Sequence, residues 1–209
     1  MKKLLTIIGL LFIFRSLMAP CLLEVQESEM VHRMMEGYQR TMYEKHYESQ
    51  KEKLIEHLSH KESNHNWKAI NTIGCMGEWQ FTVGTLRSLG YKNITPGAFK
   101  ENPNIFSPEI QKNALVKLMD SNLKGIKSYM GYVGKVINGV KITKSGLIAA
   151  MHLGGQGSVR AYLRTNGNID KHDAYGTKIS DYIREFSMHN LSNYNPDIVI
   201  FSSDFRVLQ

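Results

Sequence analysis

The chain has 209 residues, which suits one domain with appended segments and is too short for two ordinary domains. Hydrophobic residues make up 42% and aromatic residues 10%, so the composition excludes a disordered chain. The net charge of +7 favours an anionic partner, but the basic residues are dispersed and form no arginine-rich arm, so nucleic acid is not expected as a partner. Two cysteines and eight scattered histidines predict neither a disulfide framework nor a metal site, and no cofactor is expected.

Residues 1–22 have the features of an export signal. Two lysines precede the apolar run 4–14, which is too short to span a bilayer by itself. Together with the residues up to 22, the run would also suit an uncleaved membrane anchor, and Cys21 lies in a degraded lipobox that leaves lipidation as a third alternative. We therefore expect an exported protein of the periplasm or cell envelope, either released or anchored to the membrane.

A helical pattern follows from residue 23 to about residue 59. Apolar residues recur there at three- and four-residue steps among charged ones: Met30, Val31, Met34, Met35, Tyr38, Met42, Tyr43 and Tyr47. This pattern predicts a long amphipathic helix, a stalk over residues 23–50, whose apolar stripe packs within the protein. The alternative is a coiled coil or a surface that binds an envelope or secretion-machine partner.

A second helical segment carries Leu54, Ile55 and Leu58, and Glu62 continues the same face four residues further on. Beyond it, residues 82–89 predict a short helix that ends at Gly90. We therefore expect a carboxylate at the end of an apolar stripe, followed by a glycine-bounded loop and a short helix.

Ser107 and Pro108 provide the cap and first position of a helix that should reach about residue 122 and end near Gly125. The segment 136–142 contains an Asn-Gly turn between β-branched residues and predicts a small hairpin.

Thr143 caps another helix, through Leu153, that two glycines stop. Two short helices are expected at 158–166 and 177–188, and the tail from residue 190 holds a candidate edge strand at 197–201. The chain is therefore predicted to be mainly α-helical, with one small β-hairpin and a long N-terminal helix.

Glu62 is a candidate catalytic acid on physical grounds. A carboxyl group at the end of an apolar stripe is partly removed from water, which disfavours its charged form. Glycoside cleavage needs a proton donor for the leaving oxygen. The alternative is an exposed glutamate in a charged Lys-Glu-Ser run.

The segment from Glu62 to Gln80 reads ESNHNWKAINTIGCMGEWQ and is similar to the signature of soluble lytic transglycosylases and g-type lysozymes. That signature is Glu-Ser, five residues, Ala, one residue, Ser, two residues, Gly-Ala, one residue, Gly-Leu-Met-Gln. The register holds without a gap at Glu62, Ser63, Ala69, Asn71, Gly74, Gly77 and Gln80. The departures are Cys75, a small replacement for alanine that we expect to be buried, and the pair Glu78-Trp79. Glu78 is interpreted as a solvated surface residue, with a role in tuning Glu62 or the substrate as the alternative.

Two later blocks extend the resemblance. Residues 150–159, AMHLGGQGSV, are similar to the family's Ala-Ala-Tyr-Asn-Ala-Gly-Pro-Gly-Ala-Val, with His152 and Leu153 in place of Tyr and Asn. Residues 177–183 resemble the family's Thr-x-x-Tyr-Val segment, which implies that Tyr182 faces Glu62. Altogether the resemblance covers about residues 51–187.

The resemblance implies a lysozyme-like catalytic domain over residues 51–189, followed by a tail at 190–209, and a peptidoglycan glycan strand as substrate. Glu62 would be the single general acid and base of a lytic transglycosylase. The implied substrate-binding residues are Ser63, Gly77, Gln80, His152 and Tyr182. A lysozyme-type hydrolase would need a second carboxylate to position water, for which Glu78, Asp173 and Asp181 are candidates. The alternative from another class is a non-catalytic peptidoglycan-binding or envelope-assembly module.

Overall fold

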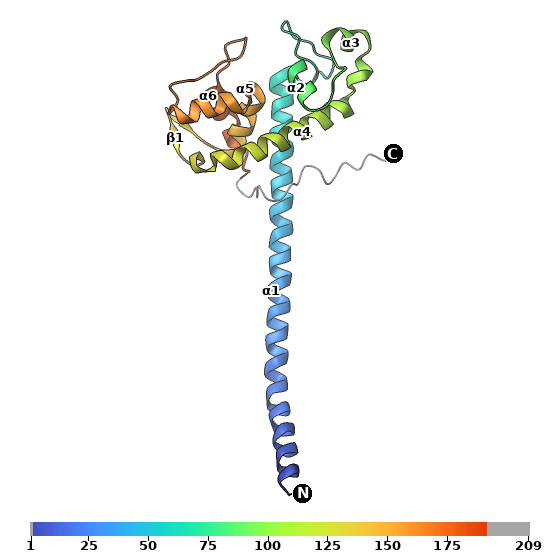
Figure 1. The fold of residues 1–209 in the computed structure, drawn as a ribbon, viewed down its shortest axis with the longest axis vertical. Coiled ribbons are helices and arrows are strands. Elements are labelled where there is room, and N and C mark those ends of the chain that lie inside the picture. Colours follow the sequence, from blue (N-terminus) through green and yellow to red (C-terminus); the bar gives the residue numbers. More distant parts are fainter. Residues whose placement is uncertain (1, 192–209) are drawn as a thin grey trace. The chain divides into compact units, whose positions relative to one another are not determined.

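The computed structural model of the chain describes residues 2–191, with side chains from Glu29 onward. The chain divides into two compact units, Met1–His46 and Tyr47–Gln209. Helices dominate both, as predicted (Figure 1). The predicted edge strand at 197–201 and most of the tail lie outside the described residues, as do the side chains of the export segment and of Cys21.

Helix α1 spans Lys2–Ser63 without a break and so contributes to both units. The two helical segments predicted on either side of residue 50 are therefore one helix. The reason lies in the sequence, because no glycine or proline occurs between Tyr38 and Ser63 to interrupt the backbone hydrogen bonds. No helix among the residues with described side chains is long and apolar enough to cross a membrane.

The apolar stripe of the first unit does not pack within the protein, contrary to our interpretation of its spacing. Its members are exposed: Met30, Val31, Met34, Met35, Tyr38, Met42 and Tyr43. Exposed ion pairs one helical turn apart link side chains along this helix, Arg33 with Glu29 at 3.2 Å and Arg40 with Glu44 at 3.0 Å. Burial begins in the second unit at Tyr47, which is 2% exposed. Helical spacing alone predicted the helix but not what covers its stripe.

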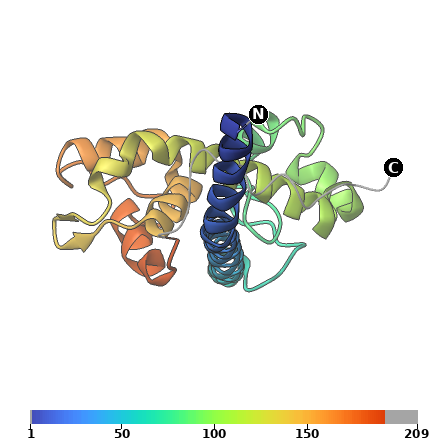
Figure 2. The ribbon, with the colours of Figure 1, turned by 90° about the horizontal axis from the view of Figure 1, so that it is seen from below.

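The second unit contains short helices around two longer ones. After α1 come α2 (Val83–Ser88), α3 (Pro96–Glu101), η1 (Pro103–Phe106), α4 (Pro108–Ile126), η2 (Lys127–Tyr132), β1 (Val136–Ile137), β2 (Val140–Lys141), α5 (Lys144–Arg164), α6 (Ile179–Glu185) and η3 (Phe186–Met188). Helices α2 and α3 lie toward the N-terminal end of α4, and the hairpin, α5 and α6 toward its C-terminal end (Figures 1 and 2).

The predicted caps form as the sequence indicates. The side chains of Thr82, Ser107 and Thr143 accept hydrogen bonds from backbone N–H groups of α2, α4 and α5. The predicted hairpin is also present, with Ile137 opposite Val140 across an Asn-Gly turn whose two residues have φ of 49° and 75°. These local signals fixed the element boundaries to within a few residues.

Helix α5 is interrupted at Gly155, where φ is 71° and ψ is 167°. This break corresponds to the predicted stop after Leu153, and the segment beyond it corresponds to the next predicted helix. Close packing on α6 positions the first half of α5, because a Cβ at Gly146 would lie 2.5 Å from the carbonyl oxygen of Ile183. The core of the unit gathers around α5, with Leu147 and Ala150 fully buried.

Candidate active site

Glu62 lies in the last turn of α1 and follows the buried residues Leu54 and Leu58 on the same face. Its side chain is 15% exposed, so the carboxyl group is largely removed from water while retaining access to it. The helix ends one residue later because Asn64 and His65 adopt left-handed φ values of 53° and 62°. The expected carboxylate at the end of an apolar stripe is therefore present.

The loop after α1 is fixed by hydrogen bonds to its own glycine-bounded turns. Ser63 Oγ donates to the carbonyl oxygen of Glu78 at 2.8 Å and accepts from Asn66 N at 3.0 Å. Gly77 N donates to the Ala69 carbonyl at 2.8 Å, and a Cβ at Gly77 would lie 2.4 Å from Gln111 Oε1. Ser63 and Gly77 therefore build the wall behind the site.

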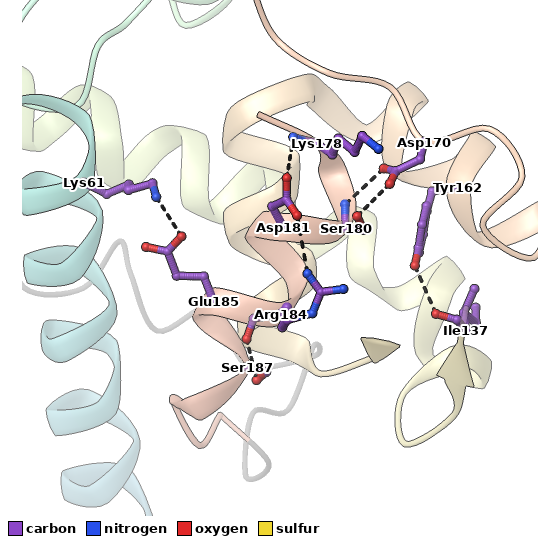
Figure 3. Close-up of polar contacts among 10 residues, drawn as sticks. All are labelled: Lys61, Ile137, Tyr162, Asp170, Lys178, Ser180, Asp181, Arg184, Glu185 and Ser187. Carbon is purple, nitrogen blue, oxygen red and sulfur yellow. Dashed lines mark hydrogen bonds and ion pairs between the residues drawn. The ribbon is translucent and has the colours of Figure 1, made fainter. Parts of the chain in front are cut away.

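Tyr182 in α6 donates a hydrogen bond from its hydroxyl to Glu62 Oε1 at 2.5 Å. Burial raises the pKa of the Tyr182 phenol far above its usual value, and the neighbouring charge of Glu62 raises it further. The phenol is therefore a fixed donor. An ion pair at 2.8 Å between Lys61 Nζ and Glu185 Oε2 joins the same two helices (Figure 3).

His152 in α5 approaches the same carboxyl group. Its Nε2 lies 4.0 Å from Glu62 Oε1 and 2.9 Å from the carbonyl oxygen of Trp79. A carbonyl oxygen can only accept, so Nε2 carries a proton and donates a hydrogen bond to the carbonyl of Trp79. The imidazole is 8% exposed and thus links α5 to the loop that ends at Gln80.

A pocket of about 390 Å³ adjoins Glu62. Four of the six site residues implied by the sequence line it, namely Glu62, Gln80, His152 and Tyr182. Ser63 and Gly77 are absent from its lining. Gln80 has a left-handed φ of 49° and donates from Nε2 to the Gly77 carbonyl at 2.8 Å, so its amide also braces the wall.

Glu78 is not a solvated surface residue, as its sequence context had suggested. It is half-buried, and its Oε1 accepts a hydrogen bond from Ser59 Oγ at 2.6 Å. Ser59 is buried and also contacts His65 Nδ1 at 2.7 Å. The solvated interpretation failed because it considered the charge of the residue and not the serine that the preceding helix presents to it.

The other two carboxylates differ in position. Asp181 accepts from Lys178 N at 3.1 Å at the start of α6 and pairs with Arg184 at 3.4 Å, and it does not line the pocket (Figure 3). Asp173 does line it. Its Oδ1 accepts from the backbone N–H groups of Tyr175 at 2.9 Å and Thr177 at 2.8 Å, so this oxygen holds a turn.

Several pocket residues were not singled out as site residues by the sequence: Asn71, Ile73, Thr82, Thr85, Leu118, Tyr175 and Thr177. Among these, Asn71 could have been found from the sequence, because it occupies the serine position of the signature.

Cys75 lines the pocket and is buried as expected, and burial raises the pKa of its thiol. The Asn71 side chain lowers this pKa, whereas the charges of Glu62 and Asp173 raise it further.

No group of three or more histidine, cysteine, aspartate or glutamate side chains suited to a metal ion occurs within the described part of the chain. In a comparison with known families, a model described as Transglycosylase SLT domain matches residues 41–174. No curated protein and no solved structure matches the chain.

Proposed function

Because the chain belongs to the Transglycosylase SLT domain family, a family of lysozyme-like fold, we propose that it is a lytic transglycosylase that cleaves peptidoglycan. The bond would be the glycosidic bond between N-acetylmuramic acid and N-acetylglucosamine. The observation that carries the proposal is the contact of Glu62 with a buried phenol, 2.5 Å away, beside a pocket of about 390 Å³.

The Tyr182 hydrogen bond assigns different tasks to the two oxygens of Glu62. Oε1 accepts the hydrogen bond of the phenol, so in the neutral acid the carboxyl proton is carried by Oε2. Oε2 then gives this proton to the glycosidic oxygen of the leaving N-acetylglucosamine as the carbon–oxygen bond breaks. The muramic acid ring acquires oxocarbenium character at its anomeric carbon.

Ring closure completes the reaction. The 6-hydroxyl oxygen of the same muramic acid bonds to the anomeric carbon, and its proton passes to the Glu62 carboxylate. The product is a 1,6-anhydro sugar and the acid is restored. The substrate supplies the nucleophile, so one glutamate suffices. Asp173 is not needed as a second catalytic carboxylate and keeps its hydrogen bonds to the backbone of its turn.

Five residues support Glu62 in this proposal. Tyr182 bonds the carboxyl group, His152 bonds the Trp79 carbonyl in the loop that ends at Gln80, and Gln80 contributes a pocket surface for the sugar. Ser63 and Gly77, which the resemblance implied as substrate-binding residues, act through the shape of the wall.

The test is incubation of the purified full-length chain with isolated peptidoglycan, with the released muropeptides identified by mass spectrometry. Anhydro products, one water lighter than hydrolytic products and lost in Glu62→Gln, are expected. Hydrated products lost in the same variant would instead identify a lysozyme-type hydrolase. Retained binding to peptidoglycan without release would leave a non-catalytic binding module.

We also propose that the chain works outside the cytoplasm, because its substrate lies there and residues 1–22 have the pattern of an export signal. The exposed apolar stripe of the first unit supports a partner in the envelope for this helix. Protease accessibility in spheroplasts tests the location, and a photo-crosslinking residue at Tyr38 tests the partner. Protection of the chain from protease would refute the proposed location. The absence of crosslinks to any envelope protein would refute the proposed partner.

A further inference from the structure

Side chains of α1 bind both residues that flank the short helix η3. Glu185 precedes η3 and His189 follows it. Glu185 Oε2 lies 2.8 Å from Lys61 Nζ, and its Oε1 lies 3.4 Å from His57 Nε2 (Figure 3 shows the lysine pair). His189 Nε2 lies 3.0 Å from the other ring nitrogen of His57, Nδ1. The ring of His57 therefore contacts both ends of η3, and we call its contact with His189 the histidine link.

Phe186, the first residue of η3, connects the histidine link to the candidate active site. Its ring is fully buried, with its centroid 4.3 Å from that of His57 and 5.2 Å from that of Tyr182. Tyr182 in turn donates its hydroxyl to Glu62 Oε1 at 2.5 Å. A shift of the phenol by about 1 Å would take this donor beyond ordinary hydrogen-bond distance. Phe186 thus packs between the histidine that holds η3 and the tyrosine that binds the acid.

The partners of the two imidazoles assign their protons. A carboxylate oxygen can only accept, so the contact with Glu185 favours a proton on His57 Nε2. In the neutral ring His57 Nδ1 is then an acceptor, and His189 Nε2 donates to it. Both histidines are therefore satisfied in their neutral forms.

Two added protons affect the histidine link differently. One proton can go to His189 Nδ1, which is outside the shared hydrogen bond, so the link remains. A second proton must go to His57 Nδ1, where the new N–H would point at the N–H of His189 across 3.0 Å. The link is therefore stable with no added proton or with one, and it is broken by two.

The surroundings determine the pH at which the second proton binds. Burial lowers the pKa of His189, and the neighbouring His57 and Lys53 lower it further. Glu185 is the carboxylate that faces His57. Helix α5 also packs against η3, and its buried charged residue is Lys144. Both imidazoles are consequently charged only at a pH below about 6.5, the usual value for histidine.

We propose that the histidine link is an acid-sensitive device that positions Tyr182 against Glu62, so that cleavage stops when His57 and His189 are both charged. The inference rests on the proposed lytic transglycosylase function and adds how pH regulates that site. A single catalytic acid works in its protonated form, so falling pH should by itself raise the rate to a plateau. A loss of rate at still lower pH therefore needs another group, and the histidine link supplies one.

The first experiment measures the initial rate of anhydro-muropeptide release by the full-length chain between about pH 7.5 and about pH 4.5. The wild-type rate should pass through a maximum and then fall about tenfold per pH unit once both imidazoles are charged. His189→Gln keeps an N–H donor and cannot be charged in this range. The ratio of its rate at about pH 4.5 to its maximum should exceed the wild-type ratio by about fivefold or more. Because ratios are compared, a change in the overall rate does not affect the test.

His60→Gln is the matched control, because His60 is exposed and lies three residues from His57 in the same helix. It should keep the wild-type pH profile. Circular dichroism confines the comparison to pH values at which all three chains are folded. A wild-type rate that stays on its plateau would overturn the inference, and so would a fall that His189→Gln leaves unchanged. Either result would still leave a lytic transglycosylase.

A second experiment does not depend on turnover. The full-length Glu62→Gln chain keeps an acceptor for the phenol but loses the titration of the acid. It is labelled with 3-fluorotyrosine, and the fluorine NMR signal of Tyr182 is assigned by its loss in Tyr182→Phe. This signal should change in one step below about pH 6.5, and the step should be absent when His189→Gln is added. A signal that ignores pH, or a step that persists in the double variant, would overturn the inference even if wild type released no anhydro products.

Discussion

The hydroxyl of Tyr182 lies 2.5 Å from Glu62 Oε1, although 120 positions separate the two residues in the chain. Tyr182→Phe keeps the buried ring and removes this donor. We expect the rate of anhydro-muropeptide release to fall about tenfold to 100-fold, because Glu62 loses the group that fixes its orientation and its proton position.

The matched control is Tyr162→Phe. Tyr162 is also buried and donates its hydroxyl to a backbone carbonyl, that of Ile137, at 3.1 Å. This variant should lose about 1 kcal/mol of unfolding free energy and keep its rate. Equal rates for both variants would show that the phenol near Glu62 is only a packing residue.

His152→Phe is expected to lower the unfolding free energy by about 1–2 kcal/mol, because it leaves the partly buried Trp79 carbonyl without its donor. His152→Gln retains an N–H donor and should recover part of that loss. Urea denaturation of the two variants measures the difference. A stability of His152→Phe equal to wild type would mean that water replaces the imidazole at this carbonyl.

Gly77→Ala should destabilise the fold by about 2 kcal/mol or more, because a Cβ there would lie 2.4 Å from Gln111 Oε1 and φ is 79°. Gly84 provides the contrast. It lies in α2, where a Cβ would lie 3.7 Å from Thr82 Oγ1, so Gly84→Ala should be neutral or stabilise by up to about 1 kcal/mol. Thermal unfolding of both variants checks the pair, and similar melting temperatures would contradict the crowding at Gly77.

Stability should fall in mild acid through His189. Burial lowers the pKa of this imidazole, and the neighbouring His57 and Lys53 lower it further. The unfolded chain therefore binds more protons than the folded chain once the pH falls below about 6.5, the usual value for histidine. The contribution of His189 to stability is complete above that pH and is lost as the pH falls through the folded pKa.

The difference in melting temperature between about pH 7.5 and about pH 5 should consequently shrink in His189→Asn. Exposed His46 is the control, and His46→Asn should keep the wild-type difference. An unchanged difference in His189→Asn would assign the acid sensitivity to other groups.

Local signals in the sequence predicted much of the fold. The caps at Thr82, Ser107 and Thr143 and the Asn-Gly turn act over a few residues, so their effect follows from the residues themselves. Glu62 was found because its neighbours match a signature, and its placement at the end of an apolar helix face agrees with the structure.

Contacts between distant segments were harder to predict. The hydrogen bond of Glu78 with Ser59 depends on how the loop returns to α1, and the hydrogen bond between the hydroxyls of Thr72 and Tyr175 joins residues 103 positions apart. The turns that contain these two residues, NTIGC and DAYGT, were visible in the sequence as an Asx residue followed by glycine three positions on. Their meeting depends on packing that no local pattern contains.

The side chain of Gln111 bonds three separate backbone groups. Its Nε2 donates to the carbonyls of Trp67 at 2.8 Å and Phe106 at 2.7 Å, and its Oε1 accepts from Glu78 N at 2.7 Å. Because this amide is fully buried, releasing any one group leaves an unpaired polar atom inside the protein. The wall beside Glu62 and the start of α4 should therefore open together, so the amide proton of Glu78 should exchange with solvent as slowly as those within α4.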